Sequence, residues 1–239
     1  MKTSIKDNVR EFSSDALEQG GYLYTVTDRI STNFSNDRTT KAIRDIYDFR
    51  GKRVLDVGCG DGFFTQTLVN FGASEVVAID PAENAIEVAK KREIPNVQFV
   101  VGDLYDLTES DYGRFDAVCL RGVIHHLPDP QLACKVVSRL ADNVVGMEPN
   151  GLNIILKVIE KVSEYHRTHE EQSYLFNTVE KWFNEAGAQT ERMQYMNLVP
   201  IFSPDWFAKS LKVIEPVVES VPVVSSLSCG QFVFNFKVD

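Results

Sequence analysis

The chain has 239 residues, a formal net charge of −9 and a sequence pI near 5.0. This length suffices for one ordinary α/β domain with a sizeable core. Nucleic-acid binding requires clustered positive charge, and the chain has no dense run of Lys or Arg. Lys90, Lys91 and Arg92 are interpreted as the solvated end of a helix. We therefore expect no nucleic-acid partner.

The cysteines and the N-terminus indicate the compartment. Four cysteines are scattered without metal-ligand spacing, which is typical of small apolar residues in a reducing environment. Residues 1–7 lack the apolar core of a signal peptide, and no segment is long enough to span a membrane. We expect a soluble cytoplasmic protein that binds no metal ion.

The first fifty residues are polar and helical in pattern, with aromatic residues at Tyr22, Tyr24 and Phe34. Such a segment could cover a binding site, and covering segments commonly determine specificity. The alternative is that it completes the apolar exterior of a sheet. Single aromatic residues are more often core residues, so Tyr22, Tyr24 and the later Trp206 are only candidate lid residues.

The most informative segment is Val54–Gly62, Val-Leu-Asp-Val-Gly-Cys-Gly-Asp-Gly, followed by a plausible helix over residues 63–69. A strand, a glycine loop and a helix form a nucleotide-binding unit. The spacing is G-x-G-x-G, with Phe63 where the dinucleotide fingerprint has its third glycine. Carboxylates at Asp56 and Asp61 suit an ammonium and a sulfonium group better than a pyrophosphate. The loop therefore favours S-adenosylmethionine as the ligand.

Strands and helices then alternate, which predicts a mostly parallel sheet with helices on both faces. The predicted strands are Arg53–Val57, Glu75–Ile79, Val97–Val101, Phe115–Leu120 and Asn143–Met147. Predicted helices cover Ala82–Lys91 and Pro130–Leu140, the second capped by Asp129.

The C-terminal part continues this layout. Apolar residues from Leu152 to Ile159 and from Val179 to Ala186 predict two more helices, the second closed by Gly187. Phe232, Phe234 and Phe236 mark a last strand, paired antiparallel with residues 190–196. Residues 201–228 form a possible lid. We expect one domain over residues 1–239, with a helical cap over 1–50, a cofactor-binding half over 51–148 and an acceptor-side half over 149–239.

Four motifs together resemble the class I S-adenosylmethionine-dependent methyltransferases, especially small-molecule enzymes of the methyltransferase 11/25 type. The motifs are Val54–Gly62, Val76–Pro81, Phe99–Leu104, and Phe115–Val118 followed by Val123–Asp129. The resemblance covers residues 53 to about 148 well and implies a Rossmann-like, seven-stranded, mostly parallel sheet with an antiparallel last strand.

The resemblance also implies the cofactor contacts. Asp56 would accept from the methionyl ammonium, while Gly58, Cys59 and Gly60 bring the main chain close to the ligand. Asp80, followed by Pro81, would accept from the ribose hydroxyls. Asp103 would accept from the adenine amino group, Leu104 would supply a backbone donor and an apolar face, and Arg121 would offer its carbonyl to the methionyl end.

Three further residues are candidates for the chemistry. In open α/β sheets, residues just after the strands face the ligand, and here these are His125, His126 and Glu148. Histidine is a natural base for a hydroxyl or ammonium acceptor, and a carboxylate can orient it. We favour His126 over His125, with Glu148 as its possible partner. A role for one histidine in bridging loop backbones is the alternative.

A second polar cluster contains His166, His169 and Glu170. Their spacing could place metal ligands on one helical turn. No thiolate or second motif completes such a site, so a solvated, charged segment is the better interpretation.

These observations predict transfer of a methyl group from S-adenosylmethionine to O or N of a small molecule, with S-adenosylhomocysteine as product. One alternative is methylation of protein or RNA. Another is a cofactor-binding partner protein without catalysis. The protein is expected to be a monomer or a homodimer.

Overall fold

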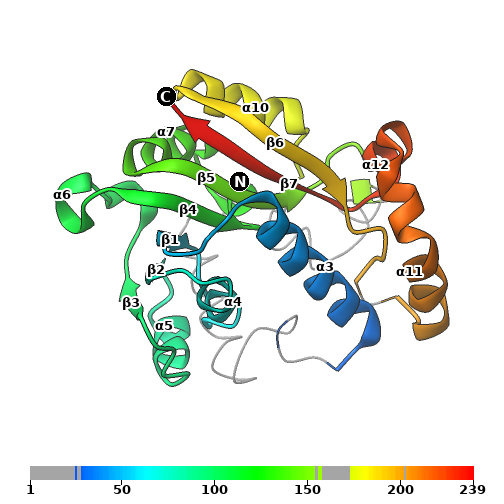
Figure 1. The fold of residues 1–239 in the computed structure, drawn as a ribbon, viewed down its shortest axis with the longest axis horizontal. Helices are drawn as coiled ribbons and strands as arrows, with labels where there is room; N and C mark the ends of the chain where they lie inside the picture. Colours follow the sequence, from blue (N-terminus) through cyan, green and yellow to red (C-terminus); the bar gives the residue numbers. More distant parts are fainter. Residues whose placement is uncertain (1–24, 26–27, 154–155, 158–172, 202) are drawn as a thin grey trace.

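The computed structural model describes Thr25 and residues 28–153, 156–157, 173–201 and 203–239. A seven-stranded sheet runs through it in the order β3-β2-β1-β4-β5-β7-β6 (Figure 1). The strands are β1 (Arg53–Val57), β2 (Glu75–Asp80), β3 (Val97–Val101), β4 (Phe115–Arg121), β5 (Ala141–Pro149), β6 (Ala188–Met196) and β7 (Gln231–Val238). Strands β1 to β5 are parallel, and β7 is antiparallel to both β5 and β6. The predicted fold class is confirmed.

The helices lie on both faces of the sheet (Figure 1). They are α3 (Ile30–Ile46), α4 (Thr65–Asn70), α5 (Glu83–Lys90), α6 (Glu109–Tyr112), α7 (Pro130–Leu140), α10 (Phe176–Glu185), α11 (Asp205–Ser220) and α12 (Pro222–Ser228). Two short 3-10 turns, η1 (Leu104–Asp106) and η2 (Ile124–His126), follow β3 and β4. The Asp129 side chain accepts from the N–H of Leu132 and caps α7, as its sequence predicts.

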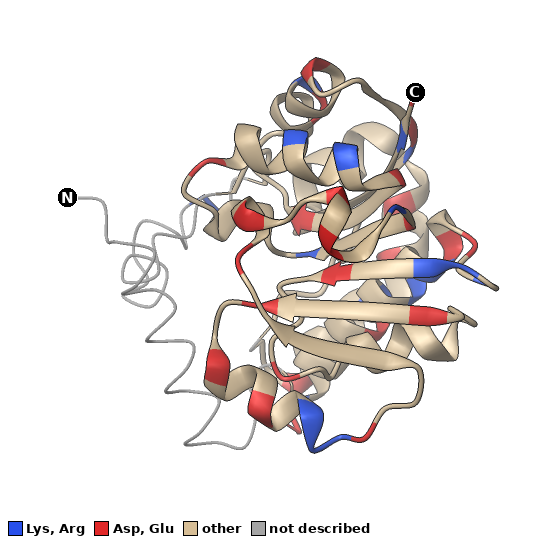
Figure 2. Ribbon diagram, turned by 90° about the vertical axis from the view of Figure 1, so that its left-hand side faces the viewer, with Lys and Arg blue, Asp and Glu red and all other residues tan. Residues whose placement is uncertain are grey.

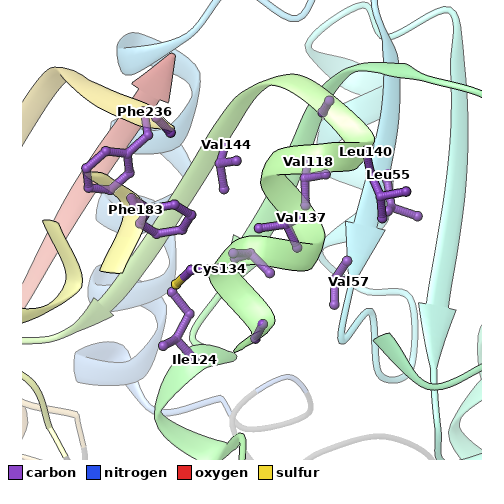
Figure 3. Close-up of a cluster of buried hydrophobic side chains, with 14 of the residues drawn as sticks. Leu55, Val57, Val118, Ile124, Cys134, Val137, Leu140, Val144, Phe183 and Phe236 are labelled. Carbon is purple, nitrogen blue, oxygen red and sulfur yellow. The ribbon is translucent and has the colours of Figure 1, made fainter. Parts of the chain in front are cut away.

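Alternating strand residues divide the core into two layers. On one face, Leu55 and Val57 belong to one apolar cluster with residues of α7, α10 and β7, and α7 lies between these two side chains and the rings of Phe183 and Phe236 (Figure 3). Phe183 of α10 stacks on Phe236 with ring centroids 4.3 Å apart. On the other face, Val54 packs with residues of α3, α4 and α5. Because both faces are covered, the central strands are apolar over most of their length, and their charged residues lie near the strand ends.

The carboxyl ends of β1 to β5 meet at one edge of the sheet, which we call the carboxyl edge. Because β7 is antiparallel, its first residue, Gln231, pairs there with Pro149 and Met196. The segment that contains α11 and α12 joins β6 to β7 and therefore leaves and rejoins the sheet at this edge.

Charge is mixed over the described surface. On the side shown in Figure 2, short basic segments are separated by acidic and uncharged ones. Within the described residues, no helix is long and apolar enough to cross a membrane.

Gly146 in the middle of β5 provides a test of this packing. A Cβ atom there would lie 2.5 Å from Cζ of Phe234 and 2.7 Å from the carbonyl oxygen of Leu120. Because the second atom is backbone, we expect Gly146→Ala to lower the free energy of unfolding by about 2 kcal/mol or more. Urea unfolding measures this change. The control is Gly102→Ala, where a Cβ meets nothing within 4 Å, and equal midpoints for the two variants would contradict the packing.

Candidate active site

The glycine loop after β1 is shaped by left-handed backbone. Gly58, Gly60 and Gly62 have φ of +70°, +53° and +76°, a region that favours glycine. A Cβ on Gly58 would lie 2.8 Å from Val123, and one on Gly62 would lie 2.9 Å from Phe99. The first glycine thus lets the loop approach the turn after β4, and the third serves packing against β3.

Asp56 ends β1 inside the protein. It is buried, and its Oδ2 accepts from the hydroxyl of Thr65 at 2.7 Å. Burial raises the pKa of Asp56 to about 6; the Thr65 hydrogen bond and the charge of Arg121 oppose this rise, and the charge of Asp80 adds to it. A carboxylate that is costly to bury in this way fits a role in binding a cationic group.

Asp80 stands at the end of β2, next to the glycine loop. Its two carboxylate oxygens accept from the N–H groups of Gly60 (2.9 Å) and Ala82 (2.8 Å). Burial raises the pKa of Asp80, and these two hydrogen bonds oppose the rise. Each oxygen keeps a second lone pair, so Asp80 can still accept from hydroxyl groups of a ligand.

Asp103 follows β3, the third strand in this row. Its Oδ1 accepts from the N–H of Tyr105 at 3.0 Å and caps η1. Leu104 is buried in the core, whereas Pro81 is exposed. Three carboxylates, Asp56, Asp80 and Asp103, thus lie at or just beyond the ends of three adjacent parallel strands, at the carboxyl edge.

Cys59 turns its side chain into the core. The thiol is buried, and burial raises its pKa well above the ordinary value, so it is protonated at neutral pH. The N–H groups of Gly58 and Cys59 both donate to the carbonyl of Ile79. The thiol faces the core and the N–H is already donated, so any ligand contact of Cys59 would use its carbonyl, which also accepts from the N–H of Gly62.

The contacts of Asp61 contradict the expectation that its charge faces a cationic ligand. Its Oδ2 accepts from Arg92 at 3.0 Å and from Thr25 at 2.9 Å, and its carbonyl accepts from Nε of Arg92. The charge of Asp61 is therefore balanced within the protein, and Arg92 is not simply a solvated helix end. Of Asp56 and Asp61, Asp56 is therefore the candidate for binding a cationic group of the ligand.

Arg121, at the end of β4, contacts other elements through its side chain, which the sequence analysis did not predict. The guanidinium donates to the Thr40 hydroxyl (2.9 Å) and the Asn36 carbonyl (3.2 Å) of α3. It also lies over the ring of Phe64, 3.4 Å from the centroid. Arg121 therefore joins α3, the glycine loop and β4, and its charge acts on Asp56.

Glu148 organises the turn after β4. One carboxylate oxygen accepts from the N–H groups of Val123 (2.9 Å) and Ile124 (2.8 Å). The other accepts from the N–H of His125 and contacts its Nδ1 at 2.7 Å. Glu148 is fully buried, so these contacts replace its hydration.

The expected pairing of Glu148 with His126 is wrong, because the short turn η2 directs the ring of His125 toward the end of β5. Only 8% of the His125 side chain is exposed, and its ring lies against that of His126, with centroids 3.9 Å apart and planes tilted by 41°. An ionised carboxylate only accepts, so Nδ1 donates and Nε2 keeps its lone pair. A Cβ on Gly122 would lie 3.5 Å from Cε1 of this ring.

Some predicted features lie outside the described residues, namely Tyr22, Tyr24, His166, His169, Glu170 and half of the predicted helix from Leu152 to Ile159. Among the described residues, no group of three or more His, Cys, Asp and Glu side chains could hold a metal ion. Trp206 is described, and it lies on the exposed side of α11.

A surface cavity of about 680 Å³ lies away from these residues, at the start of β1. Its charged side chains pair locally: Arg50 with Asp48, and Arg44 with Asp45. None of the candidate site residues lines this cavity. We therefore place the candidate site at the carboxyl edge.

The sequence analysis missed Thr65, Arg92 and the side chain of Arg121 as parts of this region. Thr65 lies nine residues from its partner Asp56, and Arg92 lies 31 residues from Asp61. A buried acidic residue needs hydrogen-bond partners, but nothing in the sequence indicates which residues supply them.

Residues 55–143 match the family model described as "Methyltransferase domain". The chain is similar to ubiquinone biosynthesis O-methyltransferases of Neisseria meningitidis serogroup C (29% identical over 138 residues, 56% of each chain) and Coxiella burnetii (31% over 144 residues, 59% of this chain and 58% of the relative). The matched part thus spans a little over half the length of these relatives.

A solved structure, magnesium protoporphyrin IX methyltransferase from Synechocystis with bound SAH, has a similar fold. The TM-score is 0.67 at 16% sequence identity, over 98% of this chain and all of the other. Because the identity is low, this similarity shows the fold.

Replacing Asp56 tests the cost of its burial. Its folded-state pKa of about 6 lies above the ordinary 3.8, so the folded protein binds more protons and the free energy of unfolding falls as pH rises from about 4 to 6. Asp56→Asn removes this loss. We expect its stability relative to wild type to grow by up to about 3 kcal/mol between pH 4 and pH 7, measured by urea unfolding at several pH values.

Asp116→Asn is the control with the opposite sign. The pKa of Asp116 is lowered, mainly by the N–H of Arg53 that it accepts. This variant should lose stability relative to wild type as pH rises from the lowered pKa of Asp116 to about 4, and the difference should stay constant at higher pH. A difference between Asp56→Asn and wild type that does not change with pH would contradict the Asp56 assignment.

Proposed function

Because the chain belongs to the class I S-adenosylmethionine-dependent methyltransferases, we propose that it transfers a methyl group to a hydroxyl oxygen of a small molecule. The observation that supports binding of S-adenosylmethionine is the row of carboxylates at Asp56, Asp80 and Asp103, beside the glycine loop. The names of the relatives, O-methyltransferases, support the choice of oxygen.

The residues present fit S-adenosylmethionine. Asp56 is a buried acceptor for the methionyl ammonium, and its raised pKa shows that the protein alone does not compensate its charge. Asp80 can accept from ribose hydroxyls while it holds the glycine loop through Gly60. Asp103 can accept from the adenine amino group, with Leu104 as an apolar neighbour. When bound, S-adenosylmethionine supplies a methyl group activated by a sulfonium.

The acceptor side requires a base. An alcohol or phenol is a poor nucleophile until its proton is removed. We propose that Nε2 of His125 receives this proton, because Glu148 fixes the opposite ring nitrogen at 2.7 Å. His126, whose ring lies against that of His125, is the second candidate base. The acceptor binds beyond the ends of β4 and β5, where specificity rests on the flanking segments.

The partner expected from this chemistry is a small molecule. The described residues present mixed charge on the side shown in Figure 2, and the chain is acidic overall. A nucleic-acid substrate is disfavoured for this reason. Turnover of S-adenosylmethionine to S-adenosylhomocysteine with a panel of hydroxylated small molecules, phenols included, tests the proposal. Tight cofactor binding without turnover of any acceptor would favour a binding protein instead.

Asp80 tests the cofactor assignment. Asp80→Ala removes the ribose acceptor and the Gly60 contact, so we expect the calorimetric Kd for S-adenosylmethionine to rise more than about tenfold, at least ~1.4 kcal/mol. Asp142→Ala, at the start of β5 and paired with Arg114 on the surface, is the control. Unchanged affinity in the Asp80 variant would exclude its role in ribose binding.

His125 tests the base. We expect His125→Ala to lower kcat by about 10²–10⁴-fold while the Kd for S-adenosylmethionine changes little. Added imidazole should restore part of the activity, which a merely structural histidine would not allow. His126→Ala is the matched comparison, and a larger loss of kcat in that variant, rescued in the same way, would assign the base to His126.

A further inference from the structure

Helices α11 and α12 present apolar side chains to solvent. They lie along one margin of the molecule, beyond the end of α3 (Figure 1). Nine apolar side chains on them are between 38% and 79% exposed: Trp206, Phe207, Val213, Ile214, Val217, Val221, Val223, Val224 and Leu227. Isolated exposed apolar residues are ordinary, but a continuous set on two neighbouring helices is not.

The two glutamates of α11, Glu215 and Glu219, point inward instead. Arg38 of α3 donates to both carboxylate oxygens of Glu219, which also accepts from the N–H of Asn197. Glu215 is buried, accepts from the N–H of Leu198 and pairs with Lys212. These bonds fix the rotation of α11. Helix α11 therefore turns acidic side chains toward the protein and apolar side chains toward solvent, the opposite of an ordinary surface helix.

The outer face also has little polar character of its own. The hydroxyls of Ser210 and Ser220 donate to carbonyls of Trp206 and Val217 in the same helix. The serines of α12 do the same. Between Trp206 and Leu227, Lys209 is the one charged residue that is exposed. A partner surface would therefore meet hydrocarbon with few polar groups to desolvate.

The size of this face suits a protein interface. The area of each full side chain follows from its transfer free energy at about 25 cal/mol per Å², or from the typical area of an aromatic residue. Multiplied by the exposed fractions, these areas give on the order of 600 Å² of exposed apolar surface for the nine residues. This is at the upper end for a monomer. It also matches the apolar share of the roughly 800 Å² that each partner buries in a stable complex.

We propose that this face pairs with the same face of a second copy of the chain. Trp206, Ser210, Val213 and Val217 recur at i, i+4, i+7 and i+11, the spacing of a seam between two paired helices. A two-fold axis brings one patch against itself, so a single surface suffices. A lipid surface suits the face less well, because the chain carries a net charge of −9 and the face carries one exposed cation.

Sedimentation at several protein concentrations tests the dimer without reference to catalysis. Wild type should be a dimer at tens of micromolar, and Val213→Glu/Val217→Glu should raise the dissociation constant at least about thirtyfold. Both side chains are exposed, so the fold should persist, and circular dichroism checks this. Leu132→Glu, a half-exposed position on α7, is the control and should leave the dimer intact. A monomeric wild type, or a dimer that the double variant leaves unchanged, would overturn the proposal.

Cross-linking locates the interface. All four native cysteines are buried, so a cysteine placed at Val213 is the readily oxidised one. Val213→Cys should form a disulfide-linked dimer under mild oxidation, and Leu132→Cys should not. Equal cross-linking of the two variants would contradict pairing through α11. Binding of monomeric wild type to neutral phosphatidylcholine vesicles, lost in Val213→Glu/Val217→Glu, would assign the face to lipid and reject the dimer.

Discussion

The buried carboxylate of Glu148 is the interaction on which the arrangement of the candidate site depends. It binds three successive backbone N–H groups of the turn after β4 and the ring of His125. Because Glu148 itself belongs to β5, these bonds attach the turn to the sheet. The same turn touches the glycine loop, since Val123 occupies the space beside Gly58. One side chain thereby fixes the proposed base and the wall of the glycine loop together.

At the carboxyl edge, the carboxylates that we propose bind the cofactor lower the stability of the folded protein. Burial raises the pKa of both Asp56 and Asp80, so each carboxylate opposes folding at neutral pH. Asp61, close in sequence, forms an ion pair with Arg92 instead. Charges left uncompensated by the protein are those that a cationic or hydroxyl-bearing ligand can use. The contrast separates the carboxylates that we propose bind the cofactor, Asp56 and Asp80, from Asp61, which binds Arg92.

Much of the architecture could be predicted from local sequence. Strands β1, β3 and α7 have the predicted bounds, and β5 is longer by two residues at each end. The glycine loop and the acidic strand ends also lie where the motifs indicate. The exchange of His126 for His125 could not be predicted, because two adjacent histidines have the same local pattern and only the path of η2 selects one. The roles assigned to the cofactor-binding residues stay predictions.

The sequence by itself determined which segments are strands and helices, and which carboxylates end the strands, because periodicity and chain position carry that information. Tertiary structure decided the pairings: Asp61 with Arg92, Glu148 with His125, and Arg38 with Glu219. It also decided that α11 turns Glu215 inward and Trp206 outward, against its own hydrophobic pattern. Partners distant in the chain set these outcomes, and hydrogen bonds to buried charges outweigh the local preference of an apolar helix face for the core.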